Sequence, residues 1–163
     1  MPSVFTSERR VEFCETDAAG IAHFSSLIIF MEQAEHALLR SLGLSVALSC
    51  TSPFKKASSH EPSYSWPRVK VECDFQGPAR FEDVLCIETS VASLGTKSVT
   101  YQHRITCNGS SIATGKMTCV CCTLQGDSLA SVPISPRIRE LLQAYLVGVP
   151  ASAGPIVEPT SAG

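Results

Sequence analysis

The sequence predicts an α+β domain in which a curved antiparallel sheet wraps around one long helix. Three observations lead to this prediction: an early apolar segment with helical spacing, several later segments in which apolar and polar residues alternate, and an Asn-Gly dipeptide between two of these later segments. At 163 residues the chain fits one domain. We assign residues 1–148 to this domain and residues 149–163, which are rich in Pro, Ala, Ser and Gly, to a flexible tail.

The long helix is predicted at residues 24–43, after a first strand at residues 4–13. Its apolar residues recur at helical spacing: Phe24, Leu27, Ile28, Met31, Ala34, Leu38 and Leu42. At a rise of about 1.5 Å per residue, this helix would be roughly 30 Å long, which is the width of a small domain. Gly43 fits the C-terminal cap of such a helix.

Four more strands are predicted from alternating apolar residues, at residues 69–75, 85–91, 98–107 and 110–124. Asn108-Gly109 favours a tight hairpin between the last two strands. Ser135 is the natural N-cap of an amphipathic C-terminal helix at residues 137–147. The polar segment 44–62, which contains two prolines, is interpreted as a mobile connection that could border a ligand pocket.

Charge and hydropathy exclude several classes of partner. The formal net charge of −2 gives no overall field for nucleic acid or an anionic membrane, so an anionic ligand would need a local cluster of basic residues. The first ten residues lack a continuous apolar run, and charged residues interrupt the long helix at Glu32, Glu35 and Arg40. The sequence therefore predicts a soluble, cytoplasmic protein that binds neither nucleic acid nor membrane.

The cysteine count favours free thiols over disulfides. Eight cysteines occur at irregular spacing, and no export signal precedes them. Cys119, Cys121 and Cys122 come closest to a metal cluster, but no pair of histidines lies near them. Free cysteine commonly packs as a small apolar residue. We therefore expect no metal and no cofactor.

The most informative motif is a strand, a tight turn and a helix start within residues 12–24. Thr16-Asp17-Ala18-Ala19-Gly20 supplies small and polar turn residues, with Gly20 free to take a positive φ and Asp17 able to bind nearby amides. This segment resembles the signature of the 4-hydroxybenzoyl-CoA thioesterase family of hotdog-fold proteins. Residues 67–91, Lys97-Ser98 and 113–115 are similar to later parts of the same family, so that the resemblance covers residues 4–147.

The resemblance implies a hotdog fold, acyl-CoA thioesterase activity, and a homodimer, often doubled to a homotetramer, with active sites at subunit boundaries. It assigns Asp17 as nucleophile or general base, with the Phe24 amide as oxyanion donor and Gly20 folding the loop so that both reach one carbonyl. Without the resemblance, Asp17 would be interpreted as a turn carboxylate that caps local amides.

The other candidate residues are weighed against simpler roles. His23 is either a pocket wall or an acid beside the leaving thiolate, or else a solvated loop histidine, which we favour. Glu32 either approaches the acyl group or steadies the loop by hydrogen bonds, or else is a buried structural carboxylate. Coenzyme A carries phosphates, for which Arg80, Lys97 and Ser98 are the favoured ligands, although each basic residue alone resembles a solvated surface charge. Arg68, Lys70, Arg104 and Lys116 are further basic candidates.

Two other functions stay open from the sequence. A hotdog hydratase or dehydratase would need a paired acid and histidine, for which His23 is the available histidine, and a non-catalytic acyl-CoA-binding protein would not need the intact Asp17 motif. No Walker loop, Gly-x-Ser-x-Gly elbow or His-Glu-x-x-His motif occurs, which disfavours a serine hydrolase. The motif also resembles 1,4-dihydroxy-2-naphthoyl-CoA hydrolases, so aromatic acyl groups are as plausible as short aliphatic ones.

Overall fold

The computed structural model of the chain describes residues 2–46, 64–125 and 127–147. Its strands are β1 (Phe5–Arg10), β2 (Arg68–Phe75), β3 (Val84–Leu94), β4 (Ser98–Cys107), β5 (Ser110–Val120), β6 (Cys122–Gln125) and β7 (Ser128–Ser131). Its helices are α1 (Phe24–Ser41), α2 (Pro136–Gln143) and a 3₁₀ turn, η1 (Phe13–Glu15). Five strands form one antiparallel sheet in the order β1-β3-β4-β5-β2, which confirms the predicted α+β class.

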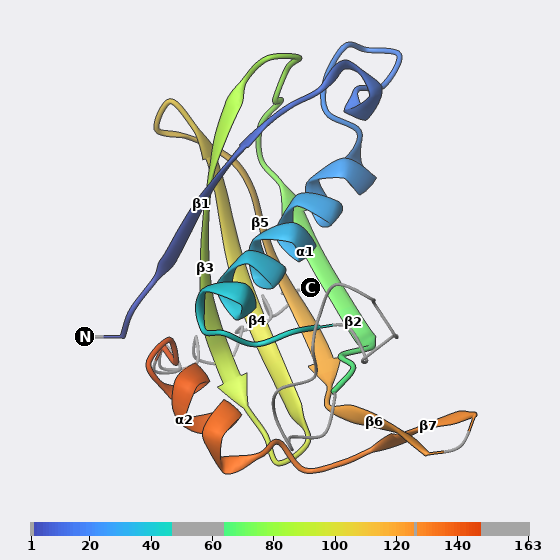
Figure 1. The fold of residues 1–163 in the computed structure, drawn as a ribbon. Helices are drawn as coiled ribbons and strands as arrows, with labels where there is room; N and C mark the ends of the chain where they lie inside the picture. The colour runs from blue at the N-terminus through green and yellow to red at the C-terminus, as the bar shows by residue number, and fades with distance from the viewer. Residues whose placement is uncertain (1, 47–63, 126, 148–163) are drawn as a thin grey trace, which may run out of the picture.

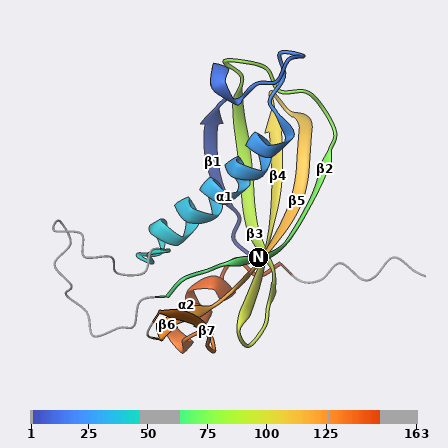
Figure 2. The ribbon, with the colours of Figure 1, turned by 90° about the vertical axis from the view of Figure 1, so that its right-hand side faces the viewer.

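Helix α1 crosses one face of this sheet, and the strands curve around it (Figures 1 and 2). It buries one apolar stripe that includes Leu27, Phe30, Met31, Ala34 and Leu38. These side chains meet the inward residues of β3, β4 and β5, so the core lies between α1 and the centre of the sheet. None of the helices in the described ranges is both long and apolar enough to cross a bilayer.

The two central hairpins follow the predicted alternation. Leu85, Ile87 and Val91 of β3 and Val99, Tyr101 and Ile105 of β4 are buried, all on the side of α1. Asn108 and Gly109 have φ angles of 50° and 81°, as the predicted tight turn between β4 and β5 requires. The predicted alternation and the predicted turn at the centre of the sheet are therefore confirmed.

Gly115 lets α1 approach β5 closely. A Cβ atom at this position would lie 2.6 Å from the Met31 sulfur and 2.9 Å from the Glu72 carbonyl oxygen. No real side chain tolerates both contacts, so a residue without a Cβ is required here. Met31 fills the space above the glycine instead.

Three element boundaries differ from the prediction. The first strand ends at Arg10 because the chain turns into η1, which leaves Phe13 76% exposed. The predicted last strand breaks at Cys121, and β6 pairs with β7 in a separate two-stranded ribbon. The C-terminal helix ends early because Leu146 forms a parallel bridge to Val91. The predictions for residues 47–62 and for the tail lie outside the described residues.

Strand β2 leaves an apolar side uncovered. Val71 is 42% exposed and Phe75 51%, although both point to the side of the sheet that carries α1. Val69, at the register shift after Arg68, is 63% exposed. Strand β2 is also an edge of the sheet, with β5 as its only partner strand in the described part of the chain. Both an unpaired strand edge and an exposed apolar strip therefore occur on this strand.

Candidate active site

The loop between η1 and α1 closes on itself as the motif predicts. The Asp17 amide donates to the Ile21 carbonyl at 2.8 Å, and the Gly20 amide donates to the Asp17 carbonyl at 3.0 Å. Gly20 has a φ of 75°, a conformation that favours glycine. A bridge between Thr16 and Ala22 fixes the base of the loop. The Asp17 side chain is thus held by a rigid turn.

Asp17 uses only one of its two carboxylate oxygens for hydrogen bonds within the turn. Its Oδ1 accepts hydrogen bonds from the amides of Ala19, at 2.8 Å, and Ile21, at 3.4 Å. No hydrogen bond reaches its Oδ2 from any residue that the structure describes. The side chain is half-buried beside the start of α1. The turn role and a chemical role are therefore compatible in the same residue.

His23 is the N-cap of α1, a role that was not considered from the sequence. Its Nδ1 accepts a hydrogen bond from the Ser25 amide at 3.3 Å and lies 2.7 Å from Ser25 Oγ. Its carbonyl oxygen accepts from the Ser26 amide at 2.9 Å. Histidine is not a typical N-cap residue, so the sequence carried no signal for this role.

The Phe24 amide is a free donor at the first position of α1. The next two amides of the helix are bound by His23, whereas the Phe24 N–H has no hydrogen-bond partner among the described residues. Free amides at a helix N-terminus carry partial positive charge and bind negatively charged oxygen atoms. The structure thus provides a donor of the kind that an oxyanion needs, at the end of the loop that carries Asp17.

A second loop, between β2 and β3, brings Arg80 to the Asp17 loop. The Ala22 amide donates to the Ala79 carbonyl at 2.7 Å, and Ile21 forms a bridge with Arg80. The Arg80 amide donates to Asp83 Oδ2 at 2.7 Å, which fixes the backbone of this second loop. Arg80 itself is exposed, so its guanidinium is available to an anionic ligand.

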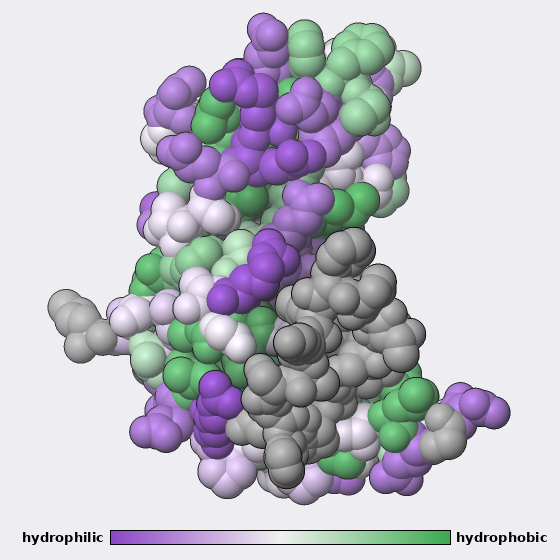
Figure 3. Space-filling model, viewed as in Figure 1, coloured by the Kyte–Doolittle hydropathy of each residue, from purple (hydrophilic) through white to green (hydrophobic). Residues whose placement is uncertain are grey.

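Exposed aromatic rings surround the two loops. The rings of Phe24 and Phe75 meet edge to face with centroids 6.4 Å apart, and those of Phe13 and Phe81 do so at 5.9 Å. All four side chains are at least 46% exposed. Figure 3 shows apolar surface at this end of the molecule. Sequence reasoning assigned no ligand contact to Phe13, Phe75 or Phe81, because their exposure depends on the tertiary structure.

Glu32 lies further along α1 and is paired with β2. Its Oε1 lies 2.8 Å from Nη1 of Arg68, and its side chain is 38% exposed. Arg68 also contacts the buried Glu35, at 3.1 Å, so it is not a solvated surface charge as its residue type alone suggests. The sequence analysis named Glu32 as a candidate but did not predict that Arg68 contacts the helix. This contact depends on the pairing of β2 with β5, which brings Arg68 to α1.

Lys97 and Ser98 lie at the opposite end of the sheet from Asp17. Lys97 lies in the turn between β3 and β4 and Ser98 begins β4, whereas the Asp17 loop packs against the turn between β2 and β3 (Figure 1). Lys97 Nζ donates to the Ser131 carbonyl at 3.3 Å. Within one chain, the structure therefore brings Arg80 to the candidate site but not Lys97 or Ser98.

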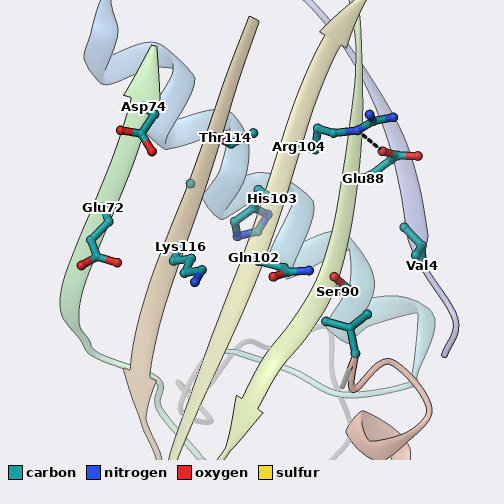
Figure 4. A pocket seen from close by; sticks show the side chains of 12 residues that line it. Val4, Glu72, Asp74, Glu88, Ser90, Gln102, His103, Arg104, Thr114 and Lys116 are labelled. Carbon is teal, nitrogen blue, oxygen red and sulfur yellow. Dashed lines mark hydrogen bonds and ion pairs between the residues drawn. The ribbon is translucent and has the colours of Figure 1, made fainter. Parts of the chain in front are cut away.

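The face of the sheet turned away from α1 carries a separate polar hollow (Figure 4). Carboxylates of Glu72, Asp74 and Glu88 line it together with Lys116 and Arg104, and Arg104 is paired with Glu88 at 2.6 Å. These charges largely balance, and α1 lies on the other face of the sheet. It is therefore a weaker candidate than the Asp17 loop for carbonyl chemistry.

The cysteines and other possible metal ligands form no metal site within the described residues. Every cysteine in the described ranges is a free thiol, as predicted. Across residues 2–46, 64–125 and 127–147, no group of three or more His, Cys, Asp or Glu side chains is arranged to hold a metal ion.

Comparison with known proteins identifies the family. Residues 19–113 match the model of the thioesterase superfamily. The 1,4-dihydroxy-2-naphthoyl-CoA hydrolase of Synechococcus elongatus is 27% identical over 136 residues, which cover 83% of this chain and 93% of that protein. The enzyme of the same name from Synechococcus sp. strain CC9605 is 30% identical over 107 residues, which cover 66% and 69% of the two chains.

Solved structures give the same result. A gentisyl-coenzyme A thioesterase is 29% identical, with a TM-score of 0.68 over 84% of this chain and 98% of that one. A 1,4-dihydroxy-2-naphthoyl-CoA thioesterase from Synechocystis, at 21% identity, shares the fold with a TM-score of 0.71 over 86% of this chain and 96% of that one. The expected hotdog fold is confirmed, and the chain belongs to the thioesterase superfamily as a thioester hydrolase.

Proposed function

We propose that the protein hydrolyses an acyl-CoA thioester to the free acid and CoA, with the reaction centred on Asp17 and the Phe24 amide. The observation that favours this most is the free Phe24 N–H at the end of a closed loop whose aspartate keeps one oxygen unbound. A helix N-terminus stabilises the negative oxygen that develops when a thioester carbonyl is attacked. Gly20 shapes the turn that holds the two groups on one loop.

Two routes are consistent with this arrangement. In the first, an Asp17 oxygen bonds to the acyl carbon, the C–S bond breaks, and CoA leaves as a thiolate, after which water hydrolyses the mixed anhydride. In the second, Asp17 removes a proton from a water molecule that attacks the same carbon, and the C–S bond then breaks so that CoA leaves as a thiolate. In both routes the Phe24 amide donates to the carbonyl oxygen. His23 acts by capping α1 and so holds that amide in position.

The ligands proposed for CoA come from two protomers. Arg80 lies beside the Asp17 loop of its own chain. In the proposed dimer, the β2 edges of two protomers pair antiparallel around a two-fold axis, which reverses the direction of one sheet relative to its partner. The end of one sheet that carries Lys97 and Ser98 then lies beside the end of the partner's sheet that carries the Asp17 loop. Lys97 and Ser98 would then contact CoA that is bound at the partner's Asp17 loop. Glu32 is proposed to lie on the acyl side of the same site.

We expect a homodimer formed through β2, and its doubling to a homotetramer is part of the proposal. An exposed apolar strip on an edge strand destabilises a free monomer in water. Val71→Lys should therefore produce monomers, as measured by light scattering after size exclusion at micromolar concentration. Val84→Lys is a matched control, because Val84 is 41% exposed but lies on the other side of the sheet, in register with Arg10 of β1. A monomeric wild-type protein would contradict the shared site.

An aromatic acyl group is favoured as substrate. The exposed rings of Phe24 and Phe75 offer aromatic faces and edges next to the helix terminus. The similar enzymes named above act, by their names, on dihydroxynaphthoyl-CoA and gentisyl-CoA. We therefore propose that this enzyme prefers aromatic over short aliphatic acyl-CoA.

A thioester panel tests the proposal directly. Benzoyl-CoA, phenylacetyl-CoA, 1,4-dihydroxy-2-naphthoyl-CoA and short aliphatic acyl-CoAs would be incubated with the protein and a thiol-trapping dye. Release of free thiol, fastest from an aromatic substrate, is the expected result. A change in enoyl absorbance without thiol release would indicate a hydratase or dehydratase instead. Saturable binding without turnover would indicate a non-catalytic acyl-CoA-binding protein.

A further inference from the structure

A buried polar cluster lies under the second half of α1, more than two helical turns beyond Phe24. Its centre is Glu35, which is 1% exposed. Glu35 Oε2 lies 3.1 Å from Nη2 of Arg68, and the Cys119 thiol lies 3.7 and 3.8 Å from the two carboxylate oxygens. A carboxylate this deep in a core needs such partners if it is to carry its charge.

Arg68 connects this cluster to the surface and α1 to β2. Besides Glu35, it contacts Glu32 Oε1 at 2.8 Å through Nη1, and its Nη2 lies 3.2 Å from His36 Nε2. Three side chains from two adjacent turns of α1 thus hold one guanidinium from the first residue of β2. The charge on this arginine is shared by two carboxylates, of which one is buried and one is half-exposed.

Three titratable groups of the sheet that interact with Glu35 or Arg68 stay neutral near pH 7. Burial lowers the pKa of His103 on β4 to about 4, and burial raises the pKa of Cys119 on β5 to about 12. Burial also raises the pKa of Tyr101 on β4 well above 10. The Tyr101 hydroxyl and His103 Nε2 are buried without a hydrogen-bond partner in the described part of the chain. None of these three groups supplies a charge that could replace that of Glu35.

Glu35 and His36 differ in the direction of their pKa shifts. Burial raises the pKa of Glu35 to about 7, and the Arg68 charge opposes this shift. Burial lowers the pKa of His36 below 6.5, and Arg68 lowers it further. Around pH 7, Glu35 is therefore the member of the cluster whose charge changes.

We propose that Glu35 and Arg68 form a proton-linked latch between α1 and β2. Loss of the Glu35 charge frees Arg68 from one of its two carboxylates and loosens the start of β2. When Glu35 is ionised, Arg68 is held between Glu32 and Glu35. When Glu35 takes up a proton, it stays buried under α1, where burial favours the neutral form, and the attraction that remains for Arg68 is the one to Glu32, at the half-exposed side of the cluster. The latch shares Glu32 with the proposed acyl site, whereas Glu35 and Arg68 have no part in the proposed thioesterase chemistry.

The chain contains its own reporter for this change. Trp66, the single tryptophan, is 6% exposed and lies two residues before Arg68. It belongs to the same apolar cluster as Tyr101 and Cys119. The neighbouring Ser65 exchanges backbone hydrogen bonds with Cys122 at 2.8 and 2.9 Å, which anchors the segment before β2. Loosening of the β2 start should therefore expose the indole and shift its emission to longer wavelength.

The test is a titration of Trp66 fluorescence from pH 5 to pH 9. In the full-length wild-type protein, we expect a reversible red shift on acidification with a midpoint near 7. Glu35→Gln keeps the shape of the side chain and removes its titration, so this variant should lack the transition and emit like the acidic wild type throughout. His36→Gln, which removes the other titrating group, should keep the transition.

Two results would overturn the latch. One is a wild-type emission spectrum that does not change between pH 5 and pH 9. The other is a transition that survives in Glu35→Gln and disappears in His36→Gln, which would assign the change to the histidine. Circular dichroism at both ends of the titration controls for unfolding. Neither result depends on whether the protein hydrolyses thioesters.

Discussion

Asp17→Asn should lower kcat by roughly 10²-fold or more on the best acyl-CoA substrate while the protein stays folded. The amide keeps the Oδ1 that accepts from the Ala19 and Ile21 amides, so the turn is retained. What is lost is the negative charge on the second oxygen, and with it the nucleophile or base. Initial rates at saturating substrate, with circular dichroism as a folding control, measure the effect.

Asp83→Asn is the matched control for this substitution. Asp83 is another turn carboxylate, and it accepts from the Arg80 amide at 2.7 Å in the loop that packs against the Asp17 loop. If both aspartates are merely turn residues, the two variants should have similar, near wild-type rates and lose at most about 1 kcal/mol of stability. Equal rates for Asp17→Asn and the wild type would remove Asp17 from the mechanism.

The free energy of unfolding should fall by about 3 kcal/mol more in the wild type than in Glu35→Gln as the pH rises from 4 to 8. The pKa of Glu35 is about 7 in the folded protein and near 4.5 in the unfolded chain. The folded state therefore binds the proton more tightly. The resulting stabilisation is complete below pH 4.5 and is lost as the pH rises through 7, because the carboxylate must then be charged inside the core.

Urea denaturation at several pH values between 4 and 8 measures this difference. Glu72→Gln is a suitable control, because Glu72 is an exposed carboxylate paired with Lys70 at 2.6 Å, and exposed pairs contribute little to stability. It should retain the pH dependence of the wild type. A Glu35→Gln variant with the same pH dependence as the wild type would show that Glu35 does not titrate in this range.

The sequence was sufficient for the elements whose signals are local. The helical spacing from Phe24 onward predicts α1, and Gly43, with a φ of 72°, ends it as expected. The alternation in β3 and β4 predicts which side chains are buried, and Asn108-Gly109 predicts the turn. The turn at Asp17 and Gly20 was also predictable, because turn chemistry depends on the residues within the turn.

The features that the sequence did not reveal depend on residues far apart in the chain. The contact between Arg68 and Glu35 requires β2 to pair with β5 beneath α1. The aromatic ring pair Phe24 and Phe75 joins the start of the helix to the end of a strand. Burial can reverse the usual behaviour of a residue type, as it does for Glu35, and periodicity does not show how deeply a charged side chain lies.

Gly115 limits which residues can change the packing distance between α1 and β5. A side chain there would meet Met31, which can be shortened by mutation, but also the Glu72 carbonyl oxygen, which cannot. Position 115 is thus closed to substitution by the backbone of the neighbouring strand, whatever residue the helix presents. Any change in the distance between helix and sheet at this level has to come from α1, at residue 31 and its neighbours. Evolution or design would therefore adjust the packing by altering the helix and leaving the sheet unchanged.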